Sequence, residues 1–186
     1  MVTTTDTTRI LTQPKVAEPV RPSLKRWLKH FFYLPLSKRY FSSRDQQEIA
    51  QAVHKAEQGH VGEIQVVIEG HIPCHQAYWQ NTQMRARQLF AELGVWDTQF
   101  NSGVLLYVNL CEQKVEIVVD RGICHATEQQ VWNEICQAMI ALFQQHQYCD
   151  AVIWGVESIG KELNFYYANS VTDHTNELDN APIVMK

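Results

Sequence analysis

The stretch that decides the fold is Trp96-Asp97-Thr98-Gln99-Phe100-Asn101-Ser102-Gly103-Val104-Leu105-Leu106-Tyr107-Val108, together with Glu116-Ile117-Val118-Val119-Asp120-Arg121-Gly122. Both segments contain an apolar strand, and the short turn between the strands predicts an antiparallel hairpin. If Asn109 pairs with Lys114, then Gly103 faces Asp120. The second strand then ends beside the loop that precedes the first. We expect function at this rim of the sheet.

Composition places the chain among ordinary globular proteins. Its 186 residues suffice for one domain with tails, and 45% of them are apolar. No stretch approaches the roughly 18 apolar residues that span a bilayer, and the Thr-rich N-terminus lacks the apolar core of a secretory signal. The five cysteines form no Cys-x-x-Cys pair. Reduced thiols and a cytoplasmic location are therefore expected.

Charge is distributed unevenly along the chain. Residues 21–44 carry seven Lys or Arg and no acid, whereas residues 45–186 carry seven Lys or Arg against eighteen Asp or Glu. A basic arm thus precedes an acidic body. A body of this sign argues against nucleic acid as a partner.

The N-terminal residues divide into a tail and an arm. Residues 1–22 are polar and Pro-containing and are predicted to be disordered. Residues 23–41 form a predicted basic amphipathic helical arm, in which Leu24, Trp27, Leu28 and Phe31 recur at helical spacing and Lys25, Arg26 and Lys29 lie off that stripe.

Three interpretations of this arm remain open. Its aromatic stripe can pack against the domain, as in most short amphipathic helices. It can instead lie on an anionic membrane surface or against a membrane protein. A homodimer is the third, because Trp27, Phe31, Phe32 and Tyr33 place many large side chains in one short segment.

Residues 42–168 show the alternation of an α/β domain. A helix capped by Ser42 or Ser43 is expected to reach about Gln58, and a second helix to span about 77–93. Strands are expected at 63–69, near an edge and with Glu63, Gln65 and Glu69 on one face, at 104–108 in the sheet centre, and at 114–120. Two further helices are predicted, one opened by a Thr127–Gln130 capping box and one capped by Asp150. Residues 169–186 are predicted to form a flexible acidic tail.

The order of these elements predicts the architecture. A helix joins the first two strands, so they should be parallel with a right-handed crossover, and the third strand is antiparallel to the second. A three-layer α/β/α sandwich around a small mixed sheet accommodates this order. The sequence leaves open whether a fourth strand is present.

The chain resembles the TPM domain family over about Arg44 to Ala168. The resemblance rests on Asp97, Asn101-Ser102-Gly103, the strands 104–108 and 115–119, and Gly122. His60-Val61-Gly62-Glu63, Trp96-Asp97 and Asp120-Arg121-Gly122 look typical of the short bacterial branch without signal peptide or C-terminal membrane anchor. The resemblance implies a Rossmann-like α/β/α fold. Some members are described as phosphatases and some bind calcium or another divalent ion.

The predicted topology gathers polar side chains at the rim. His60, Glu63, Asp97, Asn101, Asp120 and Arg121 should lie in one region. Carboxylate and amide oxygens suit calcium or magnesium, which makes Glu63, Asp97, Asn101 and Asp120 the candidate metal ligands. Arg121 and the N-terminus of the helix near Thr127 favour an anion such as phosphate. The candidate catalytic residues are then His60, as a proton carrier, with Asp120 and Arg121.

Purely structural roles account for the same residues. Asp97 and Asn101 can shape a turn, Asp120 and Arg121 can pair or cap the next helix, and Glu63 can be a solvated strand end. Cys124 near a helix start is a candidate reactive thiol or an inert half-buried one. The cluster of His71, Cys74 and His75 reads as a polar loop, with zinc or copper binding as the alternative.

The sequence therefore predicts a TPM-like binding or accessory module. We expect it to be cytoplasmic or peripheral to the inner membrane surface, with a divalent-cation site at the rim. The alternative is a divalent-metal-dependent phosphatase acting at that rim, although the chain carries no strong nucleophile motif.

Overall fold

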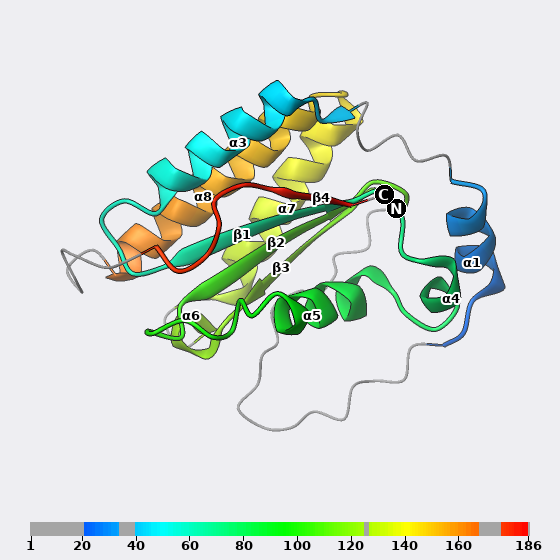
Figure 1. The fold of residues 1–186 in the computed structure, drawn as a ribbon, viewed down its shortest axis with the longest axis horizontal. Helices are drawn as coiled ribbons and strands as arrows, with labels where there is room; N and C mark the ends of the chain where they lie inside the picture. The colour runs from blue at the N-terminus through cyan, green and yellow to red at the C-terminus, as the bar shows by residue number, and fades with distance from the viewer. Residues whose placement is uncertain (1–20, 34–39, 125–126, 168–175, 186) are drawn as a thin grey trace.

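The computed structural model describes residues 21–33, 40–124, 127–167 and 176–185 (Figure 1). The helices are α1 (Leu24–Phe31), α3 (Ser43–Ala56), α4 (Cys74–Ala77), α5 (Thr82–Glu92), α6 (Arg121–Cys124), α7 (Gln129–Gln144) and α8 (Tyr148–Tyr167). The strands are β1 (Glu63–Glu69), β2 (Gly103–Asn109), β3 (Lys114–Val119) and β4 (Ile183–Met185). Nearly all of the predicted disordered tail, 1–22, lies outside the described residues.

The four strands form one mixed sheet in the order β3-β2-β1-β4. β1 and β2 are parallel, with Glu63 opposite Gly103. β2 and β3 are antiparallel, and Asn109 pairs with Lys114 as predicted. The backbone N–H of Asp120 donates to the carbonyl of Gly103 over 2.9 Å, so the predicted rim register is confirmed.

Helices cover both faces of the sheet, which confirms the three-layer sandwich. α3, α7 and α8 lie on one face and α5 on the other (Figure 1). The apolar residues of β2 divide accordingly, because Val104, Leu106 and Val108 belong to the core under α3, α7 and α8, whereas Leu105 and Tyr107 belong to the core under α5. β2 is therefore buried on both faces, as its apolar run predicted.

β1 was predicted to lie near an edge of the sheet, and this prediction is wrong. All seven of its residues are buried, and it lies between β2 and β4. The neighbour on its outer side comes from the C-terminal residues, which the sequence assigned to a flexible tail. Val67 to Glu69 pair in parallel with Ile183 to Met185. The described part of that segment, 176–185, thus completes the sheet and covers the polar face of β1.

One of the three predicted helix caps is confirmed, the Ser cap of α3, and the predicted caps of α7 and α8 are wrong. Ser42 caps α3 through a capping box with Asp45, as a Ser cap at this position predicted. The predicted Thr127 capping box is wrong, because α7 begins at Gln129 and the Thr127 hydroxyl accepts from Trp132 Nε1 over 2.9 Å. Asp150 does not cap α8 but lies in its first turn, since the helix begins at Tyr148.

The helix predicted over about 77–93 begins later than expected, because α5 covers Thr82–Glu92 and the short helix α4 already ends at Ala77. Asn81 caps α5 by accepting from the N–H of Met84 over 2.8 Å. The carbonyls of Ala77 and Tyr78 instead accept hydrogen bonds from Arg26 on α1. Arg26, 51 residues before Ala77, thus binds carbonyls that would accept backbone hydrogen bonds in a continuous helix.

Within the described helices, no stretch has the length and apolar character needed to cross a membrane.

Candidate functional site

Two glycines bring the loop before β2 onto the rim. A Cβ at Gly103 would overlap the carbonyl oxygen of Val95, and one at Gly122 would lie 2.6 Å from the carbonyl oxygen of Asn101. The N–H of Gly122 donates to that same oxygen over 3.1 Å. The two glycines of the motif therefore allow the backbone of residues 95–101 to pass directly against the ends of β2 and β3.

This close approach forms a cavity of about 450 Å³ at the rim. It is lined by Arg87, Phe90, Trp96, Asn101, Val118, Asp120 and Arg121. We call it the rim cavity. Three of the predicted site residues, Asn101, Asp120 and Arg121, contribute to it. Trp96 and Phe90 give it an apolar side, and Arg87 adds a second guanidinium that sequence reasoning missed.

Asp120 is the buried charged group of the rim cavity. Its side chain is 6% exposed. Oδ1 accepts from the N–H of Arg121 over 2.6 Å, whereas Oδ2 is buried and receives no hydrogen bond from the described residues. Burial raises the pKa of the Asp120 carboxyl, against the opposing effect of the Arg121 N–H and the Arg121 charge.

The other predicted site residues do not line the rim cavity. His60 is fully buried, and its Nδ1 accepts from the N–H of Gly62 over 3.0 Å. Glu63 is buried as well, and its Oε2 accepts from the N–H of Leu178 over 3.4 Å. Asp97 is exposed on the loop, where its N–H donates to the carbonyl of Gly94. The rim is thus divided into an open cavity and a buried polar group.

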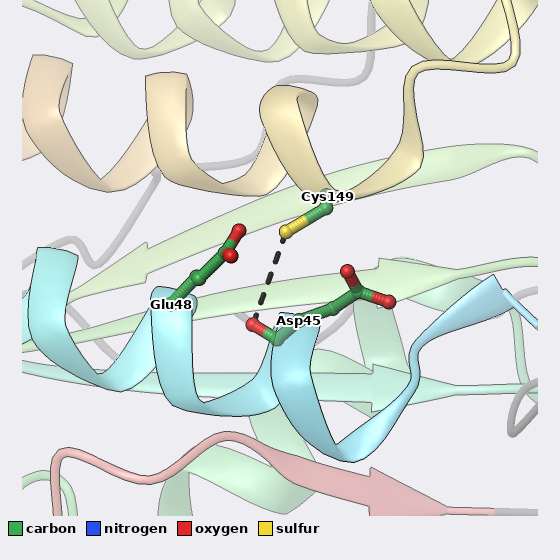
Figure 2. Close-up of side chains that lie close together, drawn as sticks. All are labelled: Asp45, Glu48 and Cys149. Carbon is green, nitrogen blue, oxygen red and sulfur yellow. Dashed lines mark hydrogen bonds between the residues drawn. The ribbon is translucent and has the colours of Figure 1, made fainter.

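One group of three described residues offers His, Cys, Asp or Glu ligand atoms within 4.8 Å of one another, namely Asp45, Glu48 and Cys149 between α3 and α8 (Figure 2). Glu63, Asp97 and Asp120 do not form such a group in the described structure. Structural roles explain the α3–α8 cluster. Asp45 serves the α3 cap, Glu48 pairs with Arg44, and the Cys149 thiol donates to the Asp45 carbonyl over 3.8 Å.

The Cys149 thiol is one of three side chains in this cluster that already have structural partners. Burial and the nearby acids, Asp45 first among them, raise its pKa to about 11. Because contacts within the protein account for all three residues, we assign no metal to this cluster. His71, Cys74 and His75 are likewise absent from the described groups of this kind. The side chain of Cys124 lies outside the described structure.

Glu57 is a buried acid that the sequence analysis missed. It follows α3, is 7% exposed, and its Oε1 accepts from the N–H of Ile64 over 2.9 Å. Burial raises its pKa from 4.5 to about 8, with Glu63 contributing in the same direction and the Ile64 N–H opposing. Glu57 falls at the end of an amphipathic helix, where an acid is usually solvated, so its sequence position carried no signal of burial.

This shift predicts a pH-dependent stability. The folded state keeps a proton that the unfolded chain releases, so the stabilisation is complete below pH 4.5 and is lost as the pH rises towards 8. Glu57→Gln should match the wild type in urea unfolding near pH 4.5. Near pH 8 it should be more stable, by on the order of 2 to 4 kcal/mol. Glu48→Gln, at a half-exposed position of α3, is the control and should show a much smaller pH-dependent difference. A pH-independent difference for Glu57→Gln would contradict the assignment.

A second buried polar network lies at the opposite end of the strands. Glu69 and Arg85 form an ion pair of 2.7 Å between β1 and α5, and both side chains are almost fully buried. The Tyr107 hydroxyl donates to Glu69 Oε2 over 2.5 Å, and Asn109 Nδ2 donates to the Tyr107 hydroxyl over 2.8 Å. Burial and the Glu69 charge hold the Tyr107 pKa well above its usual value. Every named group has a partner, so the network reads as structural.

Comparison with known proteins identifies the fold and the family to which the motif belongs. The sequence model of the TPM domain matches residues 37–162. The BA42 protein of the psychrophilic bacterium Bizionia argentinensis, solved by NMR, is 25% identical with a TM-score of 0.68, over 77% of this chain and 94% of that one. The N-terminal domain of a P. gingivalis protein is 18% identical with a TM-score of 0.59, over 72% and 83%. Among curated proteins, no match was found.

Proposed function

The chain belongs to the TPM domain family, and from this premise we propose that it is a binding or accessory module whose ligand occupies the rim cavity. The ligand we propose is an anion of the phosphate class together with a divalent cation, calcium or magnesium. The module would work in the cytoplasm, peripheral to the inner face of the membrane. The observation that carries the proposal is the buried Oδ2 of Asp120, which has no hydrogen-bond partner among the described residues, at a residue that lines a cavity together with two arginines.

The charges of the rim cavity favour an anion accompanied by a cation. Arg87 and Arg121 outnumber the single carboxylate of Asp120, so a cation alone would meet net positive charge. Guanidinium groups bind phosphate oxygens through paired hydrogen bonds. An anionic ligand would satisfy both arginines and bring its own oxygens to a cation.

The donor set fits a cation that is held in part by its ligand. Asp120 Oδ2 and the Asn101 amide oxygen would supply the protein donors. Magnesium is commonly held by one or two carboxylates, with phosphate oxygens and water in the remaining positions. The bound ion would neutralise part of the phosphate charge. Glu63, Asp97 and His60 lie outside the cavity and are not needed in this arrangement.

The alternative is a divalent-metal-dependent phosphatase at the same cavity, with Asp120 and Asn101 toward the ion and Arg121 orienting the phosphate. It is supported by the same charges. The predicted proton carrier His60 is fully buried and does not line the cavity. General acid-base work needs a group within reach of the reacting atoms, so we favour binding over hydrolysis.

Calorimetry on chelator-stripped protein tests the proposal. Magnesium, calcium or manganese chloride, each with inorganic phosphate, should bind saturably to the wild type. Asp120→Asn should weaken binding about 10- to 100-fold, because a charge-assisted contact is lost without a change in shape. Asp97→Asn is the matched control, because Asp97 is exposed and lies outside the cavity, and it should bind like the wild type.

Two results would overturn this assignment: no binding of any ion with phosphate, or equal binding by Asp120→Asn. Turnover of 4-nitrophenyl phosphate by the wild type, lost in Asp120→Asn, would instead favour the phosphatase.

A further inference from the structure

Helix α1 is attached to the domain by its polar side. Arg26 Nε donates to the carbonyl of Ala77 over 2.7 Å, and Arg26 Nη2 donates to the carbonyl of Tyr78 over 3.0 Å. The N–H of Ser23, which caps α1, donates to the same Tyr78 carbonyl. The start of the helix is thus fixed against α4 by several hydrogen bonds.

The end of α1 is fixed in the same way. His30 is 1% exposed, with Nδ1 accepting from the N–H of Ile72 over 3.1 Å and Nε2 lying 3.1 Å from Glu112 Oε1. Lys29 Nζ also approaches Glu112, at 3.4 Å. These pairings hold the Glu112 pKa at about 2. The rotation of α1 about its axis is therefore set at both ends.

The consequence is an apolar surface turned towards solvent. Leu24 is 62% exposed, Leu28 40%, Phe31 54% and Phe32 72%, and Trp79 beside α4 adds a side chain that is 59% exposed. We call this the outer face of α1. Of the stripe that the first interpretation packs against the domain, Trp27 is half-buried, whereas Leu24, Leu28 and Phe31 are exposed. α1 and α4 lie together at one end of the molecule, away from the sandwich (Figure 1).

We propose that the outer face of α1 binds the surface of an anionic lipid bilayer, which rests on the peripheral location proposed above. The described segment 21–33 carries exposed Arg21 and Lys25 and half-exposed Lys29, and no acid. Glu112, the acid nearest to it, is mostly buried and paired. Exposed leucine and aromatic side chains enter the headgroup region while neighbouring lysines and arginines meet anionic headgroups.

The same charges disfavour a second copy as the occupant. In a two-fold dimer the outer face would meet itself, and Arg21 and Lys25 would approach the same cations of the partner. An anionic bilayer neutralises these charges instead. The bilayer would repel the acidic body of the protein. The molecule would therefore bind with α1 against the bilayer and with the α/β/α sandwich facing away from it.

Co-sedimentation with lipid vesicles tests the inference on the full chain. Binding is expected to mixed phosphatidylcholine and phosphatidylglycerol vesicles, with much weaker binding to phosphatidylcholine alone. The double variant Phe31→Ser/Phe32→Ser should partition at least about tenfold less, because two exposed apolar anchors are removed. Phe165→Ser is the matched control, because Phe165 is 78% exposed on α8, and it should bind like the wild type. Circular dichroism checks that each variant is folded.

Each remaining outcome has a defined meaning. Equal binding by the double variant, or no binding of the wild type to anionic vesicles, would overturn the inference. Concentration-dependent dimerisation abolished by the double variant, without vesicle binding, would assign the face to a second copy instead. Asp120→Asn should bind vesicles normally. Failure at the vesicles with intact binding of ions and phosphate would therefore refute this inference and the peripheral location on which it rests, and would leave the ligand of the rim cavity standing.

Discussion

Gly103→Ala is expected to abolish folding or to lower the free energy of unfolding by more than about 3 kcal/mol. A methyl group at this position would overlap the carbonyl oxygen of Val95 and lie 3.0 Å from its carbonyl carbon. Both neighbours are backbone atoms, so no side-chain rotation relieves the overlap. Relief requires the loop to move away from β2, which also separates Val95 from its place in the core under α5.

Urea unfolding, followed by circular dichroism, measures this effect. Gly94→Ala is the matched control, because Gly94 has a φ of 68° but nothing lies within 4 Å of the position that a Cβ would occupy. It should cost only about 1 to 2 kcal/mol, as is usual for an alanine in the left-handed region. If both variants lose the same stability, the close backbone approach at Gly103 does not explain the Asn-x-Gly motif.

The second large effect is expected from separating the buried ion pair of Glu69 and Arg85. Arg85→Met removes the guanidinium and leaves the Glu69 carboxylate buried, with the Tyr107 hydroxyl as a remaining donor. Breaking such a pair typically costs about 3 to 5 kcal/mol, because the remaining charge is uncompensated. The loss of stability should appear as a lower urea midpoint with an unchanged slope.

Two further variants show whether the buried charge is the cause. Glu69→Gln/Arg85→Met removes both charges and should recover a large part of the stability. Arg44→Met breaks the exposed pair with Glu48 on α3 and should leave the free energy of unfolding almost unchanged. A cost for Arg85→Met no larger than that of Arg44→Met would be inconsistent with a buried, uncompensated carboxylate.

The hairpin shows what local sequence information can predict. The apolar run of β2, the alternation of β3 and the four residues between them specify the register, because turn length and pleat period leave few other pairings. Asp120 and Arg121 were thereby placed at the rim. Arg87 was not, although it lies three residues before Phe90 on the same helix. Arg87 lines the rim cavity together with residues of the loop 95–101, and the position of α5 beside that loop depends on tertiary packing.

β1 shows where local patterns fail. Its alternation predicted a strand near an edge with Glu63, Gln65 and Glu69 on one face, yet the strand is central and all three residues are buried. Their partners come from elsewhere in the chain: Leu178 donates to Glu63 across 115 residues, and Arg85 pairs with Glu69 across 16. The alternating pattern of polar residues in a strand is the same whether water or a distant part of the chain supplies their hydrogen-bond partners. The pattern therefore cannot show which of the two is present.

By itself, the amino-acid sequence determined β1, β2 and β3 and the pairings among them, the family, and the rim at which Asp120 and Arg121 lie, because these follow from motifs and from the spacing of consecutive elements. Only the tertiary structure decided that β4 closes the sheet, that the rim divides into an open cavity and a buried group, and that α1 turns its apolar side outward. The sequence pattern of α1 shows which residues lie on its polar side and which on its apolar side, but not which of the two sides faces the domain. The carbonyls of Ala77 and Tyr78, 51 and 52 residues along the chain from Arg26, decide which side meets the protein.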